Sequence, residues 1–185
     1  GGQGITGWTV TGAPGLDAAL GLTGPVPEAL RAPRARAPGP RAIGAGAPAE
    51  HPNGAIGLDH VVVIVPDFDA TAAALEHAGL PFRRVHGAAA SVRQGFRRLG
   101  PAILEVVEAP GAGASAFWGL VTTVPDLDAL QQLAAPHIKP TRSAVQSGRR
   151  IAPVGPSAGL STQLAFMDPE PARPRRPRGE RSASE

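Results

Sequence analysis

Apolar and polar residues follow two different periods between residues 57 and 168, and the same order of periods occurs twice. The first copy begins with a β-branched apolar run over 58–65, which predicts a strand. Asp67 has the residue type of a helix N-cap, and apolar residues then recur at near-helical spacing up to Gly79. Three more strands are expected, over 81–86, 92–99 and 102–108. The first copy is therefore predicted to be a βαβββ module.

The second copy repeats this order after a loop over 110–115. A strand is expected over 117–124, a helix after Pro125-Asp126, and further strands over 137–141, 146–152 and 161–167. Three matches support the repeat. Val65-Pro66-Asp67-Phe68-Asp69-Ala70 matches Val124-Pro125-Asp126-Leu127-Asp128-Ala129. The residues Gln94, Arg97, Arg98 and Leu99 match Gln146, Arg149, Arg150 and Ile151, and residues 103–108 match 163–168. Because one curved half-sheet cannot cover its own concave face, the modules 57–109 and 116–168 should pair. We expect an α+β fold in which two βαβββ modules form an open, cup-shaped mixed β-barrel.

The flanks of this region have a different composition. Much of the chain's glycine and proline (24 and 21 of 185 residues) falls outside the repeat, and residues 24–56 show no apolar periodicity. We therefore expect residues 1–56 to be an N-terminal segment that is mostly an Ala/Pro/Gly/Arg-rich linker, and 169–185 to be a disordered tail. Within the first 23 residues, 5–11 could form a strand and 16–22 a short helix.

Composition also excludes several classes of function. The absence of cysteine excludes a disulfide framework, a thiolate nucleophile and a cysteine-ligated metal. The net charge is +3, but residues 57–168 hold nine basic and nine acidic residues, so no nucleic-acid partner is expected. The longest strongly apolar run, 61–65, is far shorter than the roughly 18 residues of a membrane span. With no signal-peptide pattern, the expected location is the cytoplasm, without a membrane partner.

The repeat and its motifs resemble the glyoxalase-like, or vicinal-oxygen-chelate, superfamily, whose fold also occurs in bleomycin-resistance and dihydroxybiphenyl dioxygenase proteins. The resemblance covers about residues 57–168. This region is similar to bacterial glyoxalase-like domain proteins. Its motifs are Leu58-Asp59-His60-Val61-Val62-Val63-Ile64-Val65-Pro66-Asp67, Arg93-Gln94-Gly95-Phe96-Arg97-Arg98-Leu99-Gly100, Phe117-Trp118-Gly119-Leu120, 144–152 and Leu164-Ala165-Phe166-Met167. The resemblance implies the cup-shaped fold, but it does not specify a reaction, because one scaffold of this kind hosts many functions.

The metal-dependent members of this superfamily bind their metal through four equivalent strand positions, two in each module. The resemblance implies that the matching positions of this chain are the candidate metal ligands. The first module keeps His60 and Glu105, whereas the repeat places Gly119 and Ala165 at the matching positions of the second. A catalytic zinc needs three protein ligands, and neither glycine nor alanine can supply one. We therefore expect no cofactor, and at most a weak divalent metal on His60 and Glu105.

His60 and Glu105 remain the candidate catalytic residues. A carboxylate inside a barrel is costly unless it is paired, so the two side chains are expected to stabilise each other and could together move a proton. Strand alternation turns one arginine of each doublet inward, either to neutralise a buried carboxylate or to bind an anion. Gly119 is expected to leave room in the wall of the cup. The candidate ligand-binding residues are Val62, Ile64, Ile103, Val107, Trp118, Gly119, Arg98 and Arg150.

Three functions stay open at this point. The first is a protein with a degenerate metal site that binds a small, partly apolar molecule in its cup. The alternative is a lyase- or isomerase-type enzyme that transfers a proton next to a carbonyl with His60 or Glu105, with or without help from a metal. The third is an interaction module without a ligand. A small-molecule ligand is thus the expected partner, and a homodimer that combines modules of two chains stays open.

Overall fold

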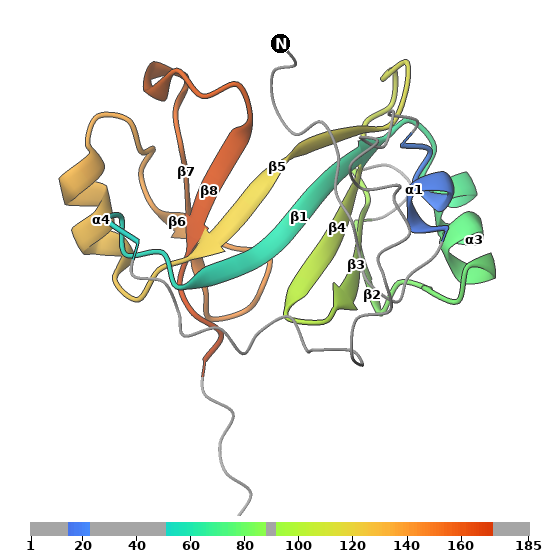
Figure 1. Ribbon diagram of the computed structural model, residues 1–185, viewed down its shortest axis with the longest axis horizontal. Helices are drawn as coiled ribbons and strands as arrows, with labels where there is room; N and C mark the ends of the chain where they lie inside the picture. The colour runs from blue at the N-terminus through green and yellow to red at the C-terminus, as the bar shows by residue number, and fades with distance from the viewer. Residues whose placement is uncertain (1–14, 23–50, 88–91, 172–185) are drawn as a thin grey trace, which may run out of the picture.

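The computed structural model describes residues 15–22, 51–87 and 92–171, and it contains an eight-stranded mixed sheet flanked by helices (Figure 1). None of the helices in these ranges is long and apolar enough to cross a membrane. In chain order the elements are α1 (Leu16–Ala19), β1 (Gly57–Val65), α3 (Phe68–His77), β2 (Arg84–His86), β3 (Gln94–Leu99), β4 (Ala102–Glu108), β5 (Ala116–Thr123), α4 (Leu127–Ala134), β6 (Arg142–Ser143), β7 (Arg150–Pro153), the 3₁₀ turn η1 (Pro156–Ala158) and β8 (Gln163–Met167).

The sheet is built from two halves with the same topology. The strand order is β2-β3-β4-β1-β5-β8-β7-β6, and the halves meet where β1 and β5 run antiparallel. In each half the first strand pairs in parallel with the fourth, β1 with β4 and β5 with β8. The sheet curls into a half-barrel, with α3 and α4 at opposite ends of the molecule (Figure 1). The predicted fold of two βαβββ modules is confirmed.

Both long helices begin at the predicted aspartates. Asp67 accepts a hydrogen bond from the backbone N–H of Ala70 at 2.9 Å, and Asp126 accepts one from Ala129 at 2.8 Å. Each carboxylate thereby satisfies one of the N–H groups left free in the first turn of its helix.

One predicted strand of the second half is wrong, and another starts later than predicted. Over 137–141 the chain forms only an isolated bridge from Ile138 to Val154, and the strand β6 follows at 142–143. The predicted strand over 146–152 begins only at residue 150, because 146–149 form a turn. In this turn the N–H of Arg149 donates to the carbonyl of Gln146, and Gly148 has φ of +74°. Apolar alternation cannot detect such a turn, since its polar residues also fit an alternating pattern.

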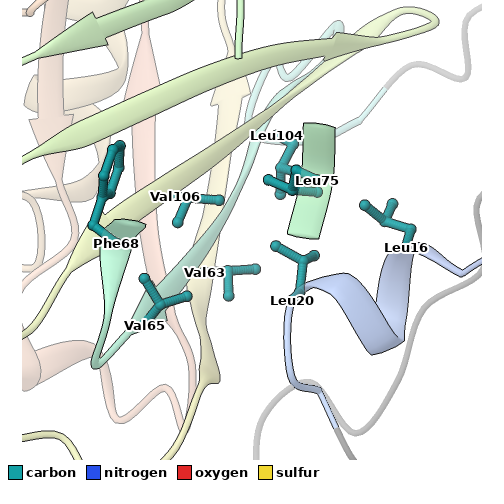
Figure 2. Close-up of a cluster of buried hydrophobic side chains, with 8 residues drawn as sticks. All are labelled: Leu16, Leu20, Val63, Val65, Phe68, Leu75, Leu104 and Val106. Carbon is teal, nitrogen blue, oxygen red and sulfur yellow. The ribbon is translucent and has the colours of Figure 1, made fainter. Parts of the chain in front are cut away.

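Two hydrophobic cores lie between the helices and the outer face of the sheet. The first contains Leu16, Leu20, Val63, Val65, Phe68, Leu75, Leu104 and Val106 (Figure 2). The second contains Val124, Leu127, Leu130, Ile138, Ala152 and Phe166. A third cluster, of Val62, Val121, Ala165 and Met167, comprises residues that alternate with the core residues along the same strands. The sheet therefore has apolar side chains on both faces, and its concave face is free to form a cavity.

The helix α1 shows that part of the N-terminal segment packs on the first module. Leu16 and Leu20 are 2% and 1% exposed and belong to the first core. The suggested helix over 16–22 thus corresponds to a shorter helix, Leu16–Ala19. The suggested strand over 5–11, and most of the expected linker and tail, lie outside the described residues.

Equivalent arginine clamps occur in the two halves. Arg93 donates two hydrogen bonds to Glu108, at 2.6 and 2.8 Å, and a third to Asp69 in the first turn of α3. Arg150 likewise binds Asp168 at the end of β8 and Asp128 in the first turn of α4. The N–H groups of Glu108 and Asp168 donate to the carbonyls of these two arginines. Arg150 is therefore the structural equivalent of Arg93, and the sequence match of Arg98 with Arg150 is out of register.

Candidate functional site

A cavity of about 320 Å³ lies on the concave face of the sheet. Both halves supply its apolar wall, β1 through Val62 and Ile64 and β8 through Ala165 and Met167. Its polar lining comes from four side chains, Gln94, Glu105, Arg142 and Gln146. The cavity is thus mainly apolar, with a small number of groups that can donate or accept hydrogen bonds.

Two β-bulges at the junction of the halves shape the site. Along β1, Leu58 faces Thr122 and His60 faces Val121, so Asp59 is an extra residue without a cross-strand partner. Along β5, Trp118 is extra in the same way, between the pairs Val62–Gly119 and Val63–Phe117. A bulge redirects side chains locally. As a result, Asp59 reaches the imidazole of its neighbour His60, and Trp118 joins the cavity lining.

The Asp59 carboxylate is the centre of a buried polar network. His60 Nδ1 lies 2.5 Å from Asp59 Oδ2, and Arg149 donates from Nη2 to Oδ1 at 2.5 Å and from Nη1 to Oδ2 at 3.2 Å. His60 and Arg149 are 1% and 6% exposed. Burial raises the pKa of Asp59, but the contacts with His60 and Arg149 outweigh this effect and hold that pKa well below its usual range. Asp59 is therefore a carboxylate, and Arg149 neutralises it.

The network connects His60 to the cavity through Gln146. Ionised Asp59 can only accept, so we assign the imidazole proton to Nδ1, which leaves Nε2 as an acceptor. The amide nitrogen of Gln146 lies 3.0 Å from His60 Nε2 and is the donor in this pair. Gln146 lines the cavity, whereas His60 does not. His60 thus orients a cavity residue instead of facing a ligand itself.

Glu105 lies in the wall of the cavity itself. Gln94 donates to Glu105 Oε1 at 3.2 Å. Burial raises the pKa of Glu105 above its ordinary value. The predicted direct pairing of His60 with Glu105 is wrong: β1–β4 register places His60 beside Ile103 and Glu105 beside Val62, and the two side chains contact different glutamines.

The other predicted cavity residues divide into two groups. Val62, Ile64, Val107 and Trp118 line the cavity, while Ile103 lies on β4 outside the lining. The prediction that Gly119 leaves room in the cup is wrong. A Cβ at this position would collide with the backbone carbonyl of Gln163 on β8, so glycine is required for close approach of two strands.

The predicted arginines lie away from the cavity. Arg98 donates to the carbonyl of Pro101 and to Glu170, and Arg150 is held in its clamp at Asp168. Both were expected to bind a ligand, but neither belongs to the lining. The arginine that does line the cavity is Arg142, which sequence reasoning missed because it lies on the unpredicted two-residue strand β6. Asp59, Gln94 and Gln146 were also missed as site residues; each lies in a motif quoted for the family resemblance or adjoins one of its candidate residues.

The residues present do not fit a metal centre of the kind expected in this superfamily. Across residues 15–22, 51–87 and 92–171, no group of three His, Cys, Asp or Glu side chains could hold a metal ion. His60 Nδ1 lies close to the Asp59 carboxylate, and its Nε2 is hydrogen-bonded to Gln146. Glu105 is contacted by the carboxamide of Gln94, and a carboxamide is not one of the usual zinc ligands.

Comparison with solved structures shows which fold this is. No family model and no curated protein sequence matches the chain. The structure is similar to methylmalonyl-CoA epimerase from Mycobacterium tuberculosis, with a TM-score of 0.53 at 18% identity over 64% of this chain and 91% of the epimerase. A Streptomyces coelicolor methylmalonyl-CoA epimerase variant in complex with 2-nitronate-propionyl-CoA gives 0.52 at 15% identity, over 64% and 97% of the two chains. A hypothetical protein from Bacillus halodurans gives 0.50 at 13% identity, over 63% and 96%. The eight-stranded sheet of two βαβββ halves is therefore the fold of the glyoxalase-like, or vicinal-oxygen-chelate, superfamily.

Proposed function

We propose that this protein binds a small, partly apolar organic molecule in the cavity on the concave face of its sheet. The observation that carries the proposal is the cavity itself, with about 320 Å³ of space, a mainly apolar wall and four polar side chains. Small-molecule sites usually have this form, in which apolar contacts supply affinity and a few polar groups fix orientation. The volume is at the lower end of the range for such sites and suits a ligand of one to three rings or a short acyl chain.

Filling the cavity tests this proposal. Ala165 lines the cavity and is 1% exposed, so Ala165→Leu places three more carbons inside it. The probe is N-phenyl-1-naphthylamine, a neutral apolar dye whose fluorescence rises on binding. We expect the parent to bind the dye, and Ala165→Leu to weaken binding at least about tenfold, as crowding of an apolar site commonly does. Ala73→Leu on the exposed side of α3 is the matched control and should bind as the parent does.

A second cavity variant guards against misfolding. Ala144→Phe changes a partly buried lining residue outside the strands and should also weaken binding of the dye. Circular dichroism of each variant checks that the fold is retained. Folded Ala165→Leu and Ala144→Phe proteins that bind the dye as the parent does would contradict the proposal.

A catalytic alternative is favoured by one particular feature, the Glu105 carboxyl group. Glu105 faces the cavity and its pKa is raised by burial, which favours a carboxyl group that takes and returns a proton. The carboxylate would remove a proton from the carbon next to a carbonyl, leaving an enolate, and the protonated acid would return it. Similar structures include methylmalonyl-CoA epimerases, whose name describes inversion at a carbon of this kind.

Exchange of the α-proton with solvent separates this alternative from binding alone. The test follows loss of the α-proton signal of a methylmalonyl thioester of N-acetylcysteamine in D₂O by NMR. If Glu105 transfers protons, the parent accelerates the exchange and Glu105→Gln abolishes the acceleration while still binding N-phenyl-1-naphthylamine. A parent protein that does not accelerate exchange contradicts the catalytic alternative for this substrate and leaves the binding proposal intact.

A further inference from the structure

Arg142 has features that define the chemistry of the ligand more closely. We infer that the ligand carries an acidic group, such as a carboxylate, sulfonate or phosphate, that is bound by Arg142 at the wall of the cavity. This inference rests on the proposed binding function and specifies the ligand class. It also assigns to Arg142 the role that the sequence suggested for Arg98 or Arg150.

The first argument is that the Arg142 guanidinium has no partner in the protein. Arg142 is exposed, and within the described part of the chain its guanidinium forms no hydrogen bond and no ion pair. Four other arginines each bind a carboxylate of the protein, namely Arg93, Arg98, Arg149 and Arg150. Arg142 is the basic residue of the cavity lining, and its five N–H donors are available to a ligand.

The second argument is the distribution of charge around the cavity. Glu105 belongs to β4 in the first half of the sheet, and Arg142 to β6 at the opposite edge of the second half. Between these strands in the sheet are β1, β5, β8 and β7, which supply apolar lining such as Val62 and Ala165. An acidic group close to ionised Glu105 would be repelled, and one on the apolar wall would lose its hydration without compensation. The wall that contains Arg142 is the place where an anion is stabilised.

The third argument is the geometry of arginine. A guanidinium can donate two parallel hydrogen bonds to a carboxylate, a sulfonate or a phosphate, which fixes the orientation of the anion as well as adding affinity. With the acidic group held at Arg142, the apolar body of the ligand lies over the centre of the cavity. The other end of the ligand then approaches Glu105 and its hydrogen-bond partner Gln94.

A matched pair of dyes tests the inference. 8-Anilinonaphthalene-1-sulfonate and N-phenyl-1-naphthylamine share one aromatic skeleton, but only the first carries an acidic group. We expect the parent to bind the sulfonate more tightly than the neutral dye. Arg142→Gln should weaken binding of the sulfonate by roughly tenfold or more, because a hydrogen bond to a charged group is lost, and should change binding of the neutral dye less than about twofold.

Two control variants complete the design. Arg84→Gln removes the same charge from an exposed position on β2 outside the cavity, and it should leave the affinity for both dyes unchanged. Arg142→Lys keeps the charge but not the planar fork, and it should restore part of the affinity for the sulfonate. Equal weakening of both dyes in Arg142→Gln would overturn the inference, as would no weakening of either.

The outcomes also separate this inference from the proposed function. If Ala165→Leu weakens binding of the neutral dye but Arg142→Gln does not affect binding of the sulfonate, the cavity binds ligands. Only the inference of an acidic group on the ligand is then wrong. If neither Ala165→Leu nor Ala144→Phe affects the neutral dye, the proposed function fails. If the parent binds neither dye, the proposed function and the inference are both contradicted.

Discussion

The Asp59 carboxylate illustrates how one residue can connect the stability of this protein to its candidate site. Its side chain is only 12% exposed, and an uncompensated charge so far out of water would be costly. Arg149 supplies the opposite charge and His60 supplies a polar contact, and Gln146 extends the network to the cavity wall. Changes in this network should therefore affect folding first, and the arrangement of the cavity second.

Removing the charge partner of Asp59 should be strongly destabilising. In Arg149→Met the carboxylate stays buried without its guanidinium, and the free energy of unfolding should fall by about 3–5 kcal/mol. Urea denaturation followed by circular dichroism measures this change. The control is Arg98→Met on an exposed part of β3, which should stay within about 0.5 kcal/mol of the parent. Combining Arg149→Met with Asp59→Asn should recover part of the loss, because no buried charge then remains unpaired. A double variant less stable than Arg149→Met would contradict this account.

Glu105 should make the folded protein less stable as the pH rises. Its folded-state pKa is raised above the ordinary value of 4.5, so the folded chain holds this proton more tightly than the unfolded chain. The contribution of Glu105 to the free energy of unfolding is fully favourable below pH 4.5, and it is lost as the pH rises through the folded-state pKa. Glu105→Gln removes the charge, so its gain over the parent in the free energy of unfolding should be larger at pH 7 than at pH 4. Urea denaturation at both pH values measures the two differences, and a smaller gain at pH 7 would contradict the assignment.

The contribution of Asp59 to stability should have the opposite pH dependence, and it should change at lower pH than that of Glu105. Its folded-state pKa lies below the ordinary value of 3.8, so the stability it contributes is present above that value and is lost as the pH falls. The loss of stability of the parent in acid should therefore be smaller in the double variant of Asp59→Asn and Arg149→Met. The same denaturation series, extended to pH 3, makes the comparison.

At the scale of elements, the pairing of β1 with β5 depends on two compensating bulges. The extra residue Asp59 on β1 shifts the pairing of the two strands by one residue. The extra residue Trp118 on β5 shifts it back. Gly119 follows the second bulge, and the backbone there approaches β8 too closely for a side chain. This local geometry, which brings Asp59 and Trp118 into the site, also explains why the position equivalent to His60 in the second half holds no side chain.

Adding a single methyl group to Gly119 should test this packing. Gly119→Ala places its Cβ against the carbonyl of Gln163, and because the obstacle is backbone, β5 and β8 must separate. We expect a loss of at least about 1–3 kcal/mol in the free energy of unfolding, the usual cost of overpacking. Gly57→Ala at the start of β1 meets nothing within 4 Å and is the control. Equal stability of the two variants in thermal denaturation would show that β5 and β8 are not held this closely.

These elements also show what the sequence could and could not predict. The repeat and the alternation of Val62, Val63, Ile64 and Val65 were sufficient for the fold, because each is set by local periodicity. The same alternation failed for Gly119, since a bulge changes the direction of the residues next to it. It also could not place Arg142, which lies on a strand of only two residues. The inference of a His60–Glu105 pair failed because the register of β1 with β4 depends on tertiary structure.

At the scale of the whole molecule, the two halves are similar but not equivalent. Each has a helix over its half-sheet. Among the described residues, the first core contains two buried leucines of the N-terminal segment, Leu16 and Leu20, whereas the second core is contacted only by the partly buried Ala55 of that segment. Figure 2 shows Leu16 and Leu20 beside Leu75, which belongs to α3. The first half is thus covered by two helices and the second by one, among the residues that the structure describes. The described residues around α1 are therefore a structural part of the first half.

The stability of the molecule should consequently depend on the segment around α1. Leu20 is 1% exposed and packs in the first core, so Leu20→Ala leaves a cavity there and should lower the free energy of unfolding by about 2–5 kcal/mol. Leu133→Ala is the control: Leu133 is 74% exposed on α4, and its replacement should change stability by less than about 0.5 kcal/mol. Urea denaturation measures both variants. Removing residues 1–22 from the chain should destabilise it more than Leu20→Ala, because Leu16 is lost as well and the surface of Leu75 that they cover becomes exposed. If the shortened chain is as stable as the parent, α1 does not stabilise the first half and the packing in Figure 2 has no energetic consequence.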